Sequence, residues 1–282
     1  MSRSASLVRW LASAGAACLL SLGAVVAHAD SGSLHTKYND LREELRSNSY
    51  GRQMHIDSSE TSNSLQGDIY AVLDHPYDQV KQAMTDPGAW CDIMLLPFNT
   101  KGCQASGNRL SVRIGRKSNQ PIADAYRIDF SFNNVSAGAN FLETRLNAAQ
   151  GPFGTRDYHI NVEAIPLEGG RTFMHMSYAY GFGGAGRFAM QAYLATAGAS
   201  KVGFTTDGVR GAVERNAMRY YLAIDAYLNT MDAPPAQRVE RRIENWFSAT
   251  ERYPRQLHEM DRDSYVQMKR QEYDRPQTAS SQ

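Results

Sequence analysis

The stretch AVLDHPYDQVKQAMTDPGAW, residues 71–90, decides how the chain around it is interpreted. It opens with apolar residues typical of a strand, and Pro76 ends that strand because its fixed φ angle suits the first turn of a helix. Apolar side chains then recur at helical spacing over 77–84, and an Asp-Pro-Gly triplet at 86–88 predicts a turn that ends the helix. A strand, a proline and an amphipathic helix are therefore expected in direct succession.

The regions on both sides extend this order. Residues 30–65 predict an N-terminal extension made of a helix and a strand. From about 107 to 180 the hydrophobic period changes to two, which is typical of an antiparallel sheet covered on one face only. Residues 208–228 form the clearest amphipathic helix, and 230–282 form a charged helical tail. Strands that run together, followed by a long helix, predict an α+β fold with its helices on one sheet face.

The segment 71–90, with Asp86, Pro87 and Trp90 in its turn, resembles the opening of the START-like, helix-grip superfamily of the polyketide cyclase and lipid transfer type. The later meander and the long helix resemble that superfamily too, so the likeness covers roughly residues 66–229. It implies a curved antiparallel sheet wrapped around the C-terminal helix. It also implies a cavity between them, which in that superfamily usually holds a lipid, sterol, polyketide or other apolar molecule.

Three segments depart from that superfamily: the extension 30–65, the insert 181–204 and the tail 230–282. No relative's ligand is therefore carried over to this chain. The insert begins with glycines that allow a hinge and continues as an apolar helix in which only Arg187 and Lys201 are charged. Such a helix is buried, covers an opening or touches a membrane. We interpret it as a lid over the cavity mouth that contacts a membrane transiently, with plain burial as the alternative.

The candidate ligand-binding residues lie on the apolar strand faces and on the apolar stripe of the long helix. Broad and deformable Tyr, Phe and Met side chains suit an adaptable apolar site, although the same residues also make a solid core. The set comprises Tyr126, Ile128, Phe130, Arg156, Tyr158, Met174, Met176, Tyr178, Val213, Ala217 and Tyr220.

Arg156 is the charged member of this set. Its even number places it on the apolar face with Tyr158, where a charge needs a partner, and Glu214 or Asp225 on the long helix could supply one. We interpret Arg156 either as a structural ion pair or rim residue, or as the anchor for a ligand carboxylate or phosphate.

Composition excludes several classes of function. The 282-residue chain has 30 Lys and Arg against 29 Asp and Glu, and it lacks basic patches interleaved with aromatics, so no nucleic-acid partner is expected. It has no nucleophile elbow, phosphate loop, dinucleotide fingerprint or zinc-protease motif, so no cofactor or metal is expected. His159 and His175 lie on consecutive strands, but a three-residue loop at 167–169 turns both to the polar face, diagonal to each other. Two ligands without a third make a poor zinc site.

Residues 1–29 are typical of an export signal, with Arg3 and Arg9 ahead of an apolar run that ends in the small-x-small triplet at 27–29. A lipid anchor at Cys18 is the weaker alternative, because the apolar residue wanted three positions earlier is missing. Cleavage after Ala29 leaves 28 basic against 29 acidic residues and no further apolar run long enough to span a bilayer. We expect a soluble protein of the periplasm of a Gram-negative cell.

The mature chain keeps two cysteines, Cys91 and Cys103. Two cysteines in an oxidising compartment are expected to pair, and the short loop between them is worth about 3 kcal/mol in the chain-entropy model. A catalytic or metal-binding thiol is the alternative reading.

These observations predict an exported protein that binds, and in one version carries, a hydrophobic small molecule or lipid between sheet and helix. An enzyme of the cyclase or hydrolase type is the first alternative, and it needs a buried acid/base pair inside the cavity. Tyr178 and Arg156 facing each other across the pocket, with a perturbed carboxylate near them, would favour it. The second alternative is an envelope interaction module without a ligand, whose tail at 230–282 docks on a partner protein rather than packing on its own domain.

Overall fold

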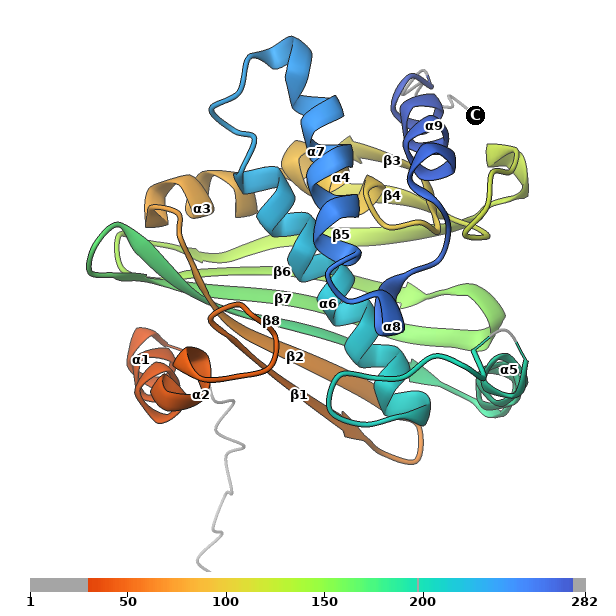
Figure 1. Ribbon diagram of the computed structural model, residues 1–282, viewed down its shortest axis with the longest axis horizontal. Coiled ribbons are helices and arrows are strands. Elements are labelled where there is room, and N and C mark those ends of the chain that lie inside the picture. Colours follow the sequence, from red (N-terminus) through yellow and green to blue (C-terminus); the bar gives the residue numbers. More distant parts are fainter. Residues whose placement is uncertain (1–29, 197, 276–282) are drawn as a thin grey trace, which may run out of the picture.

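A computed structural model describes residues 30–196 and 198–275, and Figure 1 shows one twisted sheet crossed by a long helix. The expected signal peptide at 1–29 lies outside the described residues, as does the end of the tail at 276–282. The strands are β1 (Met54–Glu60), β2 (Ser64–Leu73), β3 (Thr100–Ser106), β4 (Arg109–Ile114), β5 (Tyr126–Ala137), β6 (Leu142–Gln150), β7 (Thr155–Leu167) and β8 (Arg171–Phe182). The α-helices are α1 (Ser31–Asp40), α2 (Arg42–Arg46), α3 (Tyr77–Met84), α4 (Pro87–Leu95), α5 (Gly184–Ala195), α6 (Gly208–Leu228), α7 (Pro235–Thr250), α8 (Pro254–Leu257) and α9 (Arg262–Tyr273), and two 3-10 turns are η1 (Ile122–Asp124) and η2 (Pro152–Gly154).

The segment that opens the fold contains one helix more than its sequence pattern predicts. Strand β2, Pro76 and helix α3 follow one another as expected. Asp86, however, does not form a turn but begins α4, because its side chain accepts a hydrogen bond from the Gly88 amide at 2.8 Å and Pro87 occupies the first helical position. The buried Trp90 of α4 donates its indole N–H to the Met84 carbonyl at 2.9 Å, which fixes the angle between α3 and α4.

The strands form one antiparallel sheet in the order β1-β2-β8-β7-β6-β5-β4-β3. Its inner face carries the predicted alternation, for example Ile128, Phe130 and Phe132 on β5, which are all buried. The fold is therefore α+β, with a curved antiparallel sheet around a long C-terminal helix. Strand β3 was missed by the pattern analysis because TKGCQAS shows no apolar alternation.

The pairing of β7 with β8 is shifted by two residues from the predicted register. Val162 pairs with Met176, and Leu167 pairs with Arg171, so the loop is Glu168-Gly169-Gly170 rather than residues 167–169. Both glycines have positive φ angles, and this left-handed backbone is what lets the turn close one residue later. The parity is unchanged, so His159 and His175 still lie on the outer face, but they face Ala179 and Glu163.

Helix α6 lies against the inner face of the sheet, above β2 and β8 (Figure 1). A glycine on β2 permits this close approach, since a Cβ added to Gly67 would lie 3.2 Å from the Val213 carbonyl oxygen and 3.3 Å from the Ala217 Cβ. Val213, Ala217 and Ile224 are fully buried in this contact. The predicted amphipathic helix thus occupies its expected place.

The outer face of the sheet is not uncovered, which corrects the prediction that helices lie on one face only. The N-terminal helices α1 and α2 pack on the outer side of β7 and β1. They form a second small core that joins Leu34, Leu41 and Leu45 to outward-facing residues such as Ile165 and Phe173. The period-two pattern could not show this. An apolar residue on the polar face of a strand looks the same in sequence whether it is exposed to solvent or covered by a distant helix.

The described part of the tail, residues 230–275, shares the main core. Ile243, Trp246 and Phe247 of α7 and Tyr265 of α9 are buried in the same cluster as the sheet and α6. Trp246 donates its indole N–H to the Arg219 carbonyl at 3.0 Å. The apolar stripe of the tail is therefore used internally, while docking on an envelope partner and the domain boundary at 229 remain predictions.

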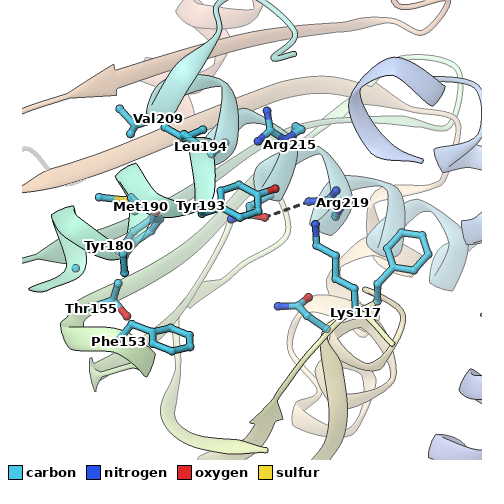
Figure 2. Close-up of a pocket in the computed structure, with 16 residues that line it drawn as sticks. Lys117, Phe153, Thr155, Tyr180, Met190, Tyr193, Leu194, Val209, Arg215 and Arg219 are labelled. Carbon is cyan, nitrogen blue, oxygen red and sulfur yellow. Dashed lines mark hydrogen bonds between the residues drawn. The ribbon is translucent and has the colours of Figure 1, made fainter. Parts of the chain in front are cut away.

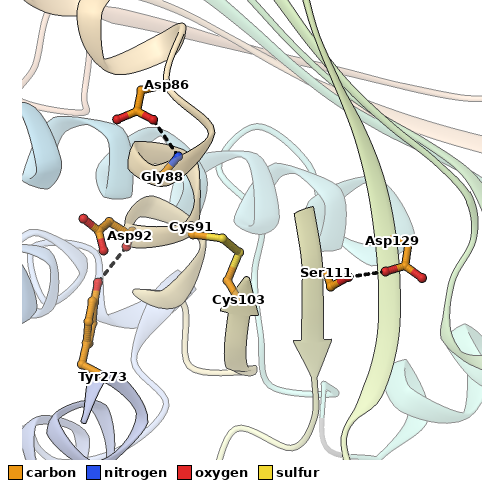
Figure 3. Close-up of a disulfide and its surroundings, with 8 residues drawn as sticks. All are labelled: Asp86, Gly88, Cys91, Asp92, Cys103, Ser111, Asp129 and Tyr273. Atoms are coloured by element: carbon orange, nitrogen blue, oxygen red, sulfur yellow. Dashed lines mark hydrogen bonds between the residues drawn. A yellow bond between two sulfur atoms is a disulfide. The ribbon is translucent and has the colours of Figure 1, made fainter. Parts of the chain in front are cut away.

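Cys91 and Cys103 form a disulfide that joins α4 to β3 (Figure 3). This confirms the predicted pairing. The loop it closes contains Phe98 and Asn99, which reach the pocket described below. In residues 30–196 and 198–275, no helix has both the length and the apolar character that crossing a bilayer requires.

Candidate ligand pocket

A pocket of about 450 Å³ lies between α6, α5 and the end of the sheet (Figure 2). Its volume falls within the range of about 300–1,000 Å³ that is usual for small-molecule sites. Its walls are supplied by six segments of the chain. They are Phe98 and Asn99; Lys117; Phe153 and Thr155; Tyr180; Gly186, Ala189, Met190, Tyr193 and Leu194 of α5; and Val209, Ala212, Arg215, Asn216 and Arg219 of α6.

Helix α5, from the predicted insert 181–204, covers one side of this pocket. The helix forms as expected, but it is not buried in the core. Gly186 is its only buried residue, and Phe188 is 73% exposed. Gly186 is held close to the turn η2, where a Cβ would lie 3.5 Å from the carbonyl oxygens of Phe153 and Gly154. The helix is therefore attached at its N-terminal end and turns Met190 and Leu194 toward the pocket.

The connection from α5 to α6 is fixed by a buried carboxylate. Glu214 of α6 accepts hydrogen bonds from the backbone N–H groups of Phe204 and Thr205, at 2.7 and 2.9 Å, and from the Ser58 hydroxyl at 2.7 Å. Arg210 reaches the same strand, donating to the Ser58 carbonyl at 2.6 Å. The connection is therefore anchored next to α6, whereas α5 itself is largely exposed.

A cluster of stacked tyrosine side chains, here called the tyrosine floor, adjoins the pocket through Tyr180, the member that lines it. Tyr158 stacks on Tyr180 with ring centroids 5.4 Å apart, and Tyr178 stacks on Tyr220 at the same distance. Burial raises the pKa of Tyr178 and of Tyr158, so both phenols are neutral at physiological pH. The Tyr180 hydroxyl contacts the Met190 sulfur at 3.7 Å, which links the floor to α5.

The opposite wall is cationic, and we name Lys117, Arg215, Arg219 and Glu259 the pocket cluster. Lys117 Nζ and Arg219 Nη2 both lie 2.6 Å from the same Glu259 oxygen, and Lys201 lies 3.8 Å from the other. Arg215 is 2% exposed, and its guanidinium donates to the Val202 carbonyl at 3.1 Å. Figure 2 shows Lys117 and Arg219 across the pocket from Met190, Tyr180 and Phe153. One side of the cavity is thus apolar and the other positively charged.

Burial and the shortage of negative charge both lower the pKa values of cations in the pocket cluster. Burial lowers the pKa of Lys117, and Arg219 lowers it further, whereas Glu259 opposes both effects. Burial also lowers the pKa of Arg219, with Arg215 adding to the effect and Glu259 opposing it. The Nε atom of Arg219 is buried without a hydrogen-bond partner in the described structure.

None of the sequence-predicted ligand residues is among the residues that line this pocket. Eight of them are buried in the main core, Tyr220 is half-buried, and Tyr126 is 44% exposed because it is the first residue of β5. The buried eight are Ile128, Phe130, Tyr158, Met174, Met176, Tyr178, Val213 and Ala217. Contact of these residues with a ligand stays a prediction.

Arg156 is placed differently from its prediction. Its side chain is 46% exposed and pairs with the adjacent Asp157 at 3.2 Å, not with Glu214 or Asp225. The cause is an irregularity in β7 between residues 156 and 159, where Asp157 adopts a φ of 51° and breaks the alternation. Asp225 pairs instead with Arg52 at 2.8 Å. Arg156 and Tyr178 therefore do not face each other across a cavity, the arrangement that would have favoured the enzymatic alternative.

The cationic wall was missed by the sequence analysis, although α6 carried a signal for it. Arg215 and Arg219 lie four residues apart on one helix face, and neither has an acidic residue three or four positions away. Like charges four residues apart repel on an exposed helix face, so this pair favours acceptors from elsewhere in the fold. Lys117 and Glu259 come from distant loops and had no local signal.

The outer-face histidines are engaged by other side chains. His159 Nδ1 lies 2.6 Å from the Asn147 amide oxygen, and His175 lies between Asp68 and Glu163, at 2.8 and 2.9 Å. Throughout residues 30–196 and 198–275, no group of three or more His, Cys, Asp or Glu residues is arranged to hold a metal ion.

No protein-family model matches this sequence, and no curated protein matches it either. Among solved structures, the chain is similar to norcoclaurine synthase from Thalictrum flavum in complex with dopamine and hydroxybenzaldehyde, at 12% identity and a TM-score of 0.37, over 64% of this chain and 90% of that one. A conserved protein from Geobacillus kaustophilus is 14% identical, with a TM-score of 0.36, over 58% and 95%. Ara h 8.0201 is 9% identical, with a TM-score of 0.34, over 62% and 98%. Because these likenesses are distant, the function is argued from the residues of this chain alone.

Proposed function

We propose that this protein binds a hydrophobic small molecule or lipid in the pocket between α5, α6 and the sheet. The observation that carries this proposal is the pocket itself, about 450 Å³ in volume and lined mainly by apolar and aromatic side chains. Transfer of an apolar ligand out of water into such a site is favourable in proportion to the apolar area it buries. The ligand's apolar part would lie against Met190, Leu194 and Val209.

We propose that the ligand enters and leaves past α5. This helix contributes five of the lining residues, yet it is attached to the rest of the fold by few buried contacts. Segments with little buried apolar surface open at low free-energy cost, which is what a lid requires. Opening at the far end of α5 would expose Met190 and Leu194 without disturbing α6.

Transient membrane contact is part of the same proposal. Two phenylalanines are strongly exposed beside the pocket, Phe153 at 79% and Phe188 at 73%. Phe153 belongs to the turn against which α5 packs, so both lie at the same end of the molecule. Exposed aromatic side chains of this kind partition into the interface of a bilayer, where an apolar ligand could pass without entering water.

The proposed location is the periplasm. It is supported by the export signal expected at 1–29 and by the disulfide between Cys91 and Cys103, since such bonds persist in oxidising compartments. Transport of the ligand between membranes would follow from this location and from the exchange route past α5.

Binding is tested with the neutral fluorescent probe N-phenyl-1-naphthylamine, using full-length protein purified from the periplasm. We expect saturable fluorescence enhancement, and we expect Ala189→Phe on α5, which fills the pocket, to weaken probe binding by about tenfold. Ala212→Phe on α6 fills the same space from the other side and is a second pocket variant. Ala192→Phe is the matched control, because Ala192 lies on the same helix, is exposed and does not line the pocket.

If the protein's own side chains fill this space in solution, the result will differ. In that case the probe would not bind saturably, or the three variants would bind it equally well, and the proposed function would be wrong. Native mass spectrometry followed by lipid extraction supplies the complementary measurement, with a co-purifying apolar molecule as the expected outcome.

A further inference from the structure

The cationic wall of the pocket has more positive charge than its only carboxylate can balance. In the described structure Lys117, Lys201 and Arg219 pair with Glu259, and Arg215 is close enough to Arg219 to lower its pKa. Burying a charge without an opposite partner is costly, so proteins normally supply one partner for each. Here the arrangement falls short by several negative charges, on a surface that lines a cavity rather than a closed core.

The hydrogen bonding of the two arginines is also incomplete. A guanidinium offers five N–H donors, yet in residues 30–196 and 198–275 Arg215 has one hydrogen-bond acceptor, the Val202 carbonyl, and no carboxylate. Arg219 donates to Glu259 and, at 3.3 Å, to Asn216, but its Nε atom is buried and unpaired. Planar guanidinium groups with free donors are the usual recognition elements for carboxylate and phosphate oxygens.

The volume of the pocket limits what such an anion could be attached to. At about 30 Å³ for each water-sized group, a cavity of about 450 Å³ holds roughly fifteen non-hydrogen atoms. That is enough for one medium-length alkyl or acyl chain with its headgroup. It is too small for a lipid with two long chains, unless one of them stays outside.

We propose that the ligand is a single-chain amphiphile whose oxyanion headgroup, a carboxylate or a phosphate, is bound by Lys117, Arg215 and Arg219. The apolar chain lies opposite, against α5 and the tyrosine floor. This inference rests on the proposed function, because it names the chemical class that the same pocket takes. The headgroup supplies the negative charge that Glu259 alone does not.

The experiment compares ligands that share a chain and differ in headgroup. Dodecanoate, dodecyl phosphate and neutral dodecanol each displace N-phenyl-1-naphthylamine from the full chain, and inorganic phosphate is added alone as the chain-free anion. We expect at least one anionic ligand to bind about tenfold or more tightly than dodecanol, the size of one charge-assisted contact in a partly buried site. Whichever of the two anions binds more tightly identifies the headgroup, and inorganic phosphate is expected to compete only weakly.

Variants connect this preference to the pocket cluster. Arg215→Met is expected to bring the ratio of anion affinity to dodecanol affinity close to one. Lys117→Met is expected to lower this ratio about threefold to tenfold. The Lys117 side chain is a third exposed, so this second variant is expected to fold. Glu259→Gln removes the competing carboxylate and is expected to raise the ratio. Arg241→Met is the matched control, because Arg241 is exposed on α7 and bonded to Gln237 away from the pocket.

The outcomes separate this inference from the function on which it rests. If the neutral probe and dodecanol bind but the anions show no preference, the headgroup inference is wrong and the apolar pocket stands. If neither the probe nor any chain binds, the proposed function itself fails. If inorganic phosphate competes as well as dodecyl phosphate, or if Arg241→Met lowers the ratio as much as Arg215→Met, the anion does not bind as the headgroup of a pocket ligand and the inference is overturned.

Discussion

Two groups of buried cations lie on either side of the disulfide loop, and they differ in how fully they are partnered. In the latch cluster, which is Lys101, Lys269 and Glu272, both ammonium groups are fully buried and each has three partners. Lys269 donates to the Pro97 and Thr100 carbonyls and to Glu272, and Lys101 donates to the Phe98 carbonyl, the Met268 sulfur and Glu272. In the pocket cluster, Lys117 and Arg219 share Glu259 with the neighbouring Lys201, and Arg215 has one carbonyl acceptor.

The comparison teaches that the supply of acceptors, more than burial, separates a structural charge from a binding one. Three donors and three acceptors complete a lysine, so the latch cluster has no capacity for a ligand and holds α9 against the loop after α4. Arg215 and Arg219 keep spare donors beside a cavity. His175 is the opposite extreme, with two carboxylates for one cation on the outer face of the sheet.

The largest effect is expected from removing the shared carboxylate of the latch cluster. Glu272→Gln leaves two fully buried lysines without an anion, and we expect the free energy of unfolding to fall by about 3–5 kcal/mol. Urea denaturation measures this. Glu240→Gln is the control, since Glu240 pairs with Arg270 of the same helix α9 at the surface and should cost under about 1 kcal/mol. Equal losses in the two variants would remove the distinction between the latch cluster and an ordinary surface pair.

The disulfide is expected to come next, because its loop supplies acceptors to the latch cluster and Phe98 to the pocket. The double variant Cys91→Ser, Cys103→Ser should lose about 3 kcal/mol of stability by the loop-entropy estimate. It should also bind the neutral probe less tightly. Wild-type protein is expected to resist thiol labelling until it is reduced, and labelling of unreduced protein would show that the bond is absent in solution.

His175 has an excess of carboxylate partners, so the pH dependence of stability tests whether acceptors keep its charge buried. Burial alone lowers the pKa of His175, but the hydrogen bonds to Asp68 and Glu163 outweigh it and raise the pKa to about 9. Since the folded pKa exceeds the unfolded value of about 6.5, the stabilisation is complete below about pH 6.5 and is lost as pH rises toward 9.

Relative to His175→Gln, the wild type should therefore lose roughly 3 kcal/mol of unfolding free energy between about pH 6 and pH 10. Denaturation curves of both proteins across that range make the measurement, and subtracting the variant removes the contribution of Lys269. Burial lowers the pKa of Lys269 to about 8, with Glu272 opposing the effect, and this works in the reverse direction. Parallel pH profiles would contradict a charged His175.

The smallest loss of stability is expected for Arg215, although a purely structural role for this buried residue would predict a large loss. Arg215→Met should change the free energy of unfolding by under about 1 kcal/mol, because it removes a buried charge that has no carboxylate partner. Arg242 is the matched comparison, since it is equally buried but pairs with Asp92 and Thr230, and Arg242→Met should cost about 3 kcal/mol. If the two variants lose similar stability, Arg215 is a structural residue like Arg242.

Local pattern was sufficient for the elements whose stability depends on a continuous apolar face. The period-two strands of the inner face and the helix α6 follow directly from the spacing of residues such as Ile128, Phe130 and Val213. The pairing of Cys91 with Cys103 followed from their number and the expected export. Local pattern failed where one backbone angle decides the outcome, as at Asp157, whose positive φ turned Arg156 to solvent.

Sequence alone thus determined the fold class, the disulfide and the apolar character of the segment that covers the pocket, because each depends on residues close together in the chain. Tertiary structure alone decided where the charges meet. Lys117, Arg219 and Glu259 are separated by up to 142 positions, and only the packing of α6 against the tail brings them to one wall. Electrostatic balance is a property of neighbours in space, and no local pattern contains it.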